Sequence, residues 1–142
     1  MDVVVGAELP EWHVASVSAE KMKTTAALLA DPNPIHFDAE AVRALGMGDR
    51  PVNQGPLNMG YVMNMLAAWS GGHDRLRRLR VRFLGNVFAG DQLRAGGVVT
   101  AVREENGDRL ADCEVFLAVV GGEPVLKGTA TVALAPATEE TR

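Results

Sequence analysis

Asp31 and His36 are the two side chains of this protein that best suit acid–base chemistry. They lie in the segment Ala30-Asp31-Pro32-Asn33-Pro34-Ile35-His36-Phe37-Asp38. Pro32 and Pro34 fix the backbone on either side of Asn33 and hold the residue before each of them out of the α region. The carboxylate and the imidazole are therefore expected on a stiff, non-helical segment. Two groups held rigidly over the same atoms are what general acid–base catalysis requires.

A plain turn is the alternative interpretation of the same segment, because Asp, Asn and Pro are also the usual turn residues. His36 would then be a packed or solvated side chain without a chemical role. Asp38 is assigned to capping a short helix from Ala39 to Leu45, closed by Gly46, rather than to catalysis.

The part of the chain before about Ser70 is predicted to be mostly helical. Residues 8–17 are expected to form a first strand, and Ser18 to cap a helix that stops at Asp31-Pro32. A third helix is predicted to begin at Gly55-Pro56, since proline suits the first helical position, and to end at Gly71-Gly72. Apolar residues occur almost all the way round this helix, so we expect it to be buried on most sides.

The part of the chain after about Ser70 has the period-two pattern of strands. Apolar residues alternate with arginines over 78–83, and residues 92–103, 110–120 and 125–134 are further candidate strands. Asn106-Gly107 is a strong hairpin signal, and Gly121-Gly122 makes a second turn. The expected fold is therefore α+β: a curved antiparallel sheet around one central apolar helix, the hot-dog arrangement. We expect one domain over residues 1–136 and a frayed tail at 137–142.

Composition restricts the classes of function. The chain has 142 residues, is 47% hydrophobic and carries a formal net charge of −4, so no nucleic-acid partner is expected. No apolar run approaches the roughly 20 residues that span a membrane, and the N-terminus lacks signal-peptide features, which favours the cytoplasm. Cys113 is expected to be a buried, inert thiol. The three dispersed histidines do not suggest a metal site, and no nucleotide-binding motif is present, so no cofactor is expected.

The motif Asp31-x-Asn33-Pro34-Ile35-His36-x-Asp38, followed by a Gly that starts an apolar helix, resembles the MaoC-like family. That family includes the (R)-specific enoyl-CoA hydratases and related dehydratases. The resemblance spans residues 20 to about 135, mostly in pattern. It implies a hydratase or dehydratase acting on a 2-enoyl or 3-hydroxyacyl thioester of coenzyme A or acyl carrier protein.

The resemblance also implies roles for individual residues. Asp31 and His36 together would bind one water molecule, with Asp31 as the general base in hydration. Asn33 would support the pair by hydrogen bonding. The enolate oxygen also needs stabilising, and the start of the central helix is the candidate from the residues themselves: its available donors are the N–H groups of Gly55, Leu57 and Asn58, of which Gly55 allows the closest approach.

Two features depart from the family or lie outside its motif. Gln54 occupies a position where members commonly have histidine, and Gln54 and Asn58 are candidate substrate-binding residues on a polar fringe of the central helix. Arg78 and Arg80 belong to a group of arginines that is either a solvated strand face or a patch for coenzyme A phosphates or an acidic carrier protein.

Two other functions remain open. A hot-dog thioesterase would direct the water at the thioester carbonyl, but such enzymes usually carry their carboxylate on the central helix, and residues 55–72 contain none. A non-catalytic subunit that completes the pocket of a related chain tends to lose the Asp/His pair, which is retained here. A homodimer is expected, with a heteromer of related chains as the alternative.

Overall fold

The computed structural model describes residues 3–135, so the expected tail at 137–142 lies outside the described residues. Helices come first and strands dominate afterwards, as the change of period near Ser70 predicts. The elements are β1 (Trp12–Val14), α1 (Ala19–Leu29), the 3-10 helix η1 (Pro34–His36), α2 (Ala39–Ala44), α3 (Gly55–Ser70), the 3-10 helix η2 (His73–Arg75), β2 (Leu76–Phe83), β3 (Leu93–Glu105), β4 (Asp108–Val119) and β5 (Pro124–Ala133).

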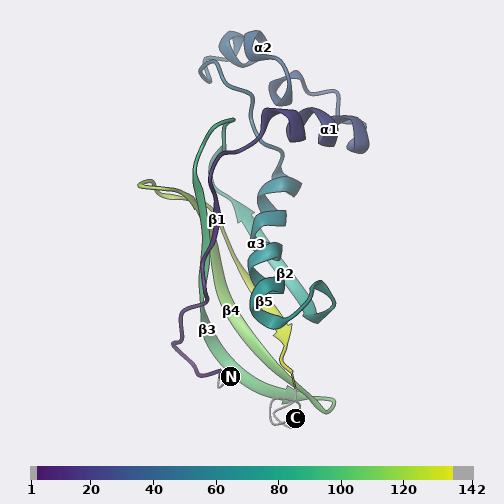
Figure 1. Cartoon of the computed structure of the whole chain (residues 1–142), viewed down its shortest axis with the longest axis vertical. Helices are drawn as coiled ribbons and strands as arrows, with labels where there is room; N and C mark the ends of the chain where they lie inside the picture. The colour runs from purple at the N-terminus through teal and green to yellow at the C-terminus, as the bar shows by residue number, and fades with distance from the viewer. Residues whose placement is uncertain (1–2, 136–142) are drawn as a thin grey trace.

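The strands form one antiparallel sheet in the order β1-β3-β4-β5-β2. The long helix α3 runs along one face of this sheet, and α1 and α2 lie beyond the end at which α3 begins (Figure 1). Val62, Met65 and Leu66 of α3 pack into one core with buried residues of the strands, among them Leu117 and Leu126. The predicted α+β hot-dog fold is confirmed.

Both predicted hairpin turns are confirmed. Asn106 and Gly107 have φ values of +53° and +85°, the left-handed pair that a two-residue turn of type I′ requires. This turn joins β3 to β4 in a register that pairs Glu105 with Asp108. At the β4–β5 turn Gly121 has a φ of +81°.

The first strand is shorter than the expected residues 8–17. The chain hydrogen-bonds to β3 at Leu9, whose N–H donates to the carbonyl of Gly97, but regular pairing begins only at Trp12. Pro10 has no N–H to donate, so it interrupts the ladder between these two points. Strand β1 therefore lies within the predicted residues 8–17 but is shorter than predicted.

Helix α1 begins as predicted and ends earlier than predicted. The side chain of Ser18 accepts a hydrogen bond from the Lys21 N–H, which confirms the expected cap. The helix ends at Leu29 because Ala30 adopts the left-handed conformation, with φ +51°. That conformation is uncommon for a residue with a Cβ, and it turns the chain sharply just before Asp31.

The central helix is less enclosed than expected. Only Asn58, Val62, Met65 and Leu66 of α3 are buried in the single chain. The expectation of burial on most sides is wrong for one chain, because one sheet covers one side of the helix. The remaining apolar residues of α3 are for the most part half-buried.

Cys113 is buried within the sheet, as expected. Burial, together with the neighbouring charge of Asp112, raises the pKa of its thiol to about 11. Among residues 3–135, no helix is long and apolar enough to cross a membrane.

Candidate active site

The loop that carries Asp31 and His36 is held by its own short-range hydrogen bonds. The Asp31 N–H donates to the carbonyl of Ala26 at 3.0 Å, so the loop starts directly from the end of α1. The Asn33 side chain accepts from the Ile35 N–H at 3.3 Å and caps η1, in which Pro34 is the first residue. The segment was expected to be non-helical, and η1 corrects this: proline suits a helix start, and Asn33 is a suitable cap.

The structure brings Asp31 and His36 together. His36 Nε2 lies 3.4 Å from Asp31 Oδ2, with the His36 side chain 11% exposed and that of Asp31 33% exposed. The other oxygen of the carboxylate, Oδ1, accepts from the backbone N–H of Asn33 at 3.0 Å. The hydrogen bond expected of Asn33 is thus made by its backbone, and it leaves Oδ2 directed at the imidazole.

The second ring nitrogen of His36 defines the tautomer. Nδ1 lies 2.7 Å from the carbonyl oxygen of Val52 in a buried contact. Because a carbonyl oxygen only accepts, Nδ1 carries the proton, and in the neutral ring Nε2 is an acceptor. Two acceptors, Nε2 and Asp31 Oδ2, then face each other. One water molecule can satisfy both by donating an O–H to each.

The residues from Val52 to Gly55 connect this loop to the start of α3. Val52 is bonded to the loop twice, since its N–H also donates to the Ile35 carbonyl at 2.8 Å. Gln54 Nε2 donates to the carbonyl of Met22, within α1, at 2.8 Å. Val52 was missed from the sequence, because a backbone carbonyl leaves no signal in residue type.

Gly55 is the first residue of α3, and its N–H donates to no acceptor among residues 3–135. Unpaired N–H groups and the helix dipole make such a helix start favourable for negative charge. A Cβ at residue 55 would lie 3.1 Å from the ring of Phe83, so the site is narrow there. Gly55 lies at the end of α3 nearest to α1 and α2 (Figure 1).

The predicted polar fringe of α3 is largely buried. Asn53 Nδ2 donates to Asn58 Oδ1 at 2.7 Å, and both residues are buried, as is Gln54. Gln54 Oε1 has no hydrogen-bond partner in the described part of the chain. Tyr61 was not singled out from the sequence; burial raises the pKa of its hydroxyl, and the Asn53 side chain opposes that shift. A substrate-binding role for Gln54 and Asn58 stays a prediction.

Arg78 and Arg80 are not brought together with the Asp/His pair. They are exposed on β2, whose alternate residues Leu79 and Val81 pack toward the core beneath α3. The two arginines therefore lie on the sheet face opposite α3. Their role in substrate binding stays a prediction.

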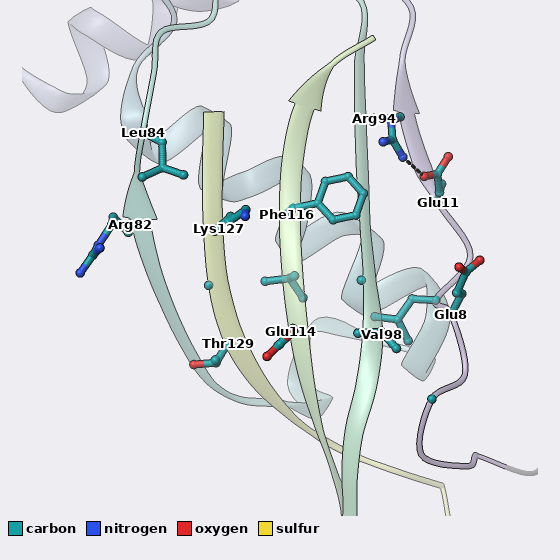
Figure 2. Close-up of a pocket in the computed structure, with 15 residues that line it drawn as sticks. Glu8, Glu11, Arg82, Leu84, Arg94, Val98, Glu114, Phe116, Lys127 and Thr129 are labelled. Atoms are coloured by element: carbon teal, nitrogen blue, oxygen red, sulfur yellow. Dashed lines mark hydrogen bonds and ion pairs between the residues drawn. The ribbon is translucent and has the colours of Figure 1, made fainter. Parts of the chain in front are cut away.

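Hollows occur on both sides of the molecule. One of about 360 Å³, between α1 and Phe37, is lined by Asp31. A larger one of about 940 Å³ lies on the sheet face away from α3 and includes neither Asp31 nor His36 (Figure 2). Arg94, Glu11 and Phe116 line this second hollow. His36 does not line the smaller hollow, so we place the candidate active site by the contact between Asp31 and His36 and not by either hollow.

Fold and site together define a hot-dog chain with an acid–base pair beside the start of its central helix. The family model described as "MaoC like domain" matches residues 10–118. The chain belongs to this family.

Individual proteins agree with this assignment. The chain is 31% identical over 137 residues to UPF0336 protein Lxx02810 of Leifsonia xyli, covering 89% of this chain and 90% of the relative. The (R)-hydratase from A. caviae involved in PHA biosynthesis is 26% identical with a TM-score of 0.81, over 94% of this chain and 98% of that one. A chain of the ChsH1-ChsH2 complex from Mycobacterium tuberculosis shares the fold, with a TM-score of 0.76, 22% identity, and coverage of 93% and 98%.

Proposed function

We propose that this chain is a hydratase or dehydratase that adds water to, or removes it from, a 2-enoyl thioester. The observation that carries the proposal is the approach of His36 Nε2 and Asp31 Oδ2 to 3.4 Å, with the opposite ring nitrogen bonded to Val52. Membership of the MaoC-like family and similarity to an (R)-hydratase support hydratase activity in general.

In the hydration direction, a water bound between the two side chains gives one proton to Asp31 as its oxygen bonds to the β-carbon. The electron pair of the double bond moves toward the thioester and forms an enolate. The Gly55 N–H stabilises the enolate oxygen. The proton that Asp31 took from the water then passes to the α-carbon, which restores the thioester and returns Asp31 to its carboxylate form, and His36 orients the water and assists this transfer. Dehydration follows the same steps in reverse.

Incubation with a panel of enoyl-CoA thioesters tests this proposal and identifies the acyl group. We expect loss of the conjugated absorbance for at least one acyl chain. Should none react, the same panel on acyl carrier protein tests the other carrier. Failure of both carriers would refute the proposed activity for the isolated chain.

A second copy of the chain is expected to complete the substrate site. The half-buried apolar residues of α3 and the unpaired edge of β2, where Phe83 is 51% exposed, are surfaces that an associated chain would cover. Sedimentation at micromolar concentration should therefore give a dimer. A monomer with full activity would contradict this prediction.

A heteromer is the second candidate, in which this chain serves as a partner subunit. The similarity to a chain of the ChsH1-ChsH2 complex favours it. In that case the chain alone would be inactive, and activity would appear only when a related hot-dog chain is added.

A further inference from the structure

Arg50 and Asp91 form an ion pair between the segment that leads into α3 and the loop that leads into β3. Arg50 Nη1 lies 2.9 Å from Asp91 Oδ1 and donates to the carbonyl of Ala89 at 2.9 Å. The guanidinium also lies over the ring of Phe88, 5.4 Å from its centre. The Asp91 side chain is only 12% exposed, and its second oxygen accepts from the Phe88 N–H at 2.9 Å. This carboxylate therefore has a partner on both oxygens.

The loop that contains Ala89 and Asp91 is hydrogen-bonded to two segments, one that leads to Val52 and one that leads into α1. These segments hold His36 and Asp31, respectively, in place. On one side, the Ala89 N–H donates to the carbonyl of Pro51, the residue before Val52, at 2.9 Å. Val52 in turn accepts from His36 Nδ1. On the other side, the Val17 N–H donates to the Asp91 carbonyl at 2.9 Å, directly before α1, the helix that ends at Leu29 and leads to Asp31.

We propose that Arg50 and Asp91 are positioning residues, which hold the Val52 carbonyl, and through it the His36 ring, in place relative to Asp31. Among residues 3–135, neither side chain forms a hydrogen bond or ion pair with Asp31 or His36. The kinetic consequence rests on the proposed hydratase function, whereas the effect on the His36 ring does not. A displacement of about 1 Å in a catalytic group can cost about 10²-fold in rate.

Arg94 provides a matched control for Arg50. It is also paired with a carboxylate, Glu11, and it lies 4.9 Å from the centre of the Phe116 ring. The Arg50 and Arg94 side chains are 50% and 42% exposed. Arg94, however, lies on the sheet face away from α3 (Figure 2). The two arginines thus make the same kinds of contact in different places.

Arg50→Gln and Arg94→Gln are compared in kinetics well below their unfolding midpoints. We expect Arg50→Gln to lower kcat about 10-fold with KM changed by less than about twofold, since only positioning is lost. Arg50→Lys, which keeps the cation, should recover most of the kcat. Arg94→Gln should match the wild type. An equal loss in both glutamine variants would overturn the proposal.

A proton NMR measurement tests the positioning without reference to activity. The His36 Nδ1–H, buried and 2.7 Å from its acceptor, should give a downfield, slowly exchanging resonance. Arg50→Gln should shift or broaden it, and Arg94→Gln should not. If Arg50→Gln does not fold, Asp91→Asn serves instead, because it keeps an acceptor for Phe88. A resonance unchanged in the folded variant would overturn the proposal even if the hydratase function were correct.

Discussion

Asp31→Asn and His36→Ala should each lower turnover by roughly 10²–10⁴-fold, the usual contribution of a positioned proton-transfer group. The two side chains act on one water through Asp31 Oδ2 and His36 Nε2, which lie 3.4 Å apart. Because they act as a unit, the double variant should be little slower than either single one. The measurement is kcat on a reactive enoyl thioester.

Asp38→Asn is the matched control for Asp31→Asn in the same loop. Asp38 Oδ1 accepts from the Glu40 N–H at 2.9 Å and caps α2, a role that asparagine also fills. This variant should keep wild-type turnover. Near-normal activity of folded Asp31→Asn protein would remove the proposed mechanism.

Two replacements of Gly55 should distinguish the effect of its N–H on kcat from the effect of its small size. Gly55→Ala keeps the N–H and adds a Cβ that approaches Phe83 to 3.1 Å. Gly55→Pro adds the same Cβ and removes the donor. It is compatible with Gln54, which already has the extended φ of −67° and ψ of 147° favoured before proline. Removal of one oxyanion donor costs about 10²–10³ in kcat, so the proline variant should be slower than the alanine variant by that factor.

Both Gly55 variants should be checked for an intact fold by thermal unfolding and by the His36 Nδ1–H resonance. Phe83 is half-exposed, so its ring can yield to the added Cβ. Equal kcat values for the two folded variants would show that the Gly55 N–H is not the oxyanion donor.

The fold was largely predictable because its signals are local. Alternation of apolar residues with arginines defines β2, and Asn106-Gly107 requires the left-handed φ pair that the structure has. Ser18, Asp38 and Pro56 mark helix starts through capping or a fixed φ. Each of these signals is determined by residues adjacent in sequence. It can therefore be recognised without knowing how the rest of the chain folds.

The parts that could not be predicted depend on contacts distant in sequence or on the backbone. Val52 fixes the His36 tautomer through a carbonyl, which every residue possesses. The Arg50–Asp91 pair joins residues separated by 41 positions. Ala30 adopts a left-handed conformation that its residue type does not favour. The incomplete burial of α3 depends on how much of it one sheet can cover.

The fate of the thioester distinguishes a hydratase from a thioesterase. Hydration and thioester hydrolysis can begin with the same water and carboxylate, and the fold does not decide between them. An enoyl-CoA substrate is followed simultaneously by its conjugated absorbance and by a thiol reagent, and the product is analysed for configuration. We expect the absorbance to fall, no thiol to appear, and the product to be the 3-hydroxyacyl thioester of R configuration. Stoichiometric thiol release without a hydroxyacyl product would contradict this expectation and would identify the chain as a thioesterase.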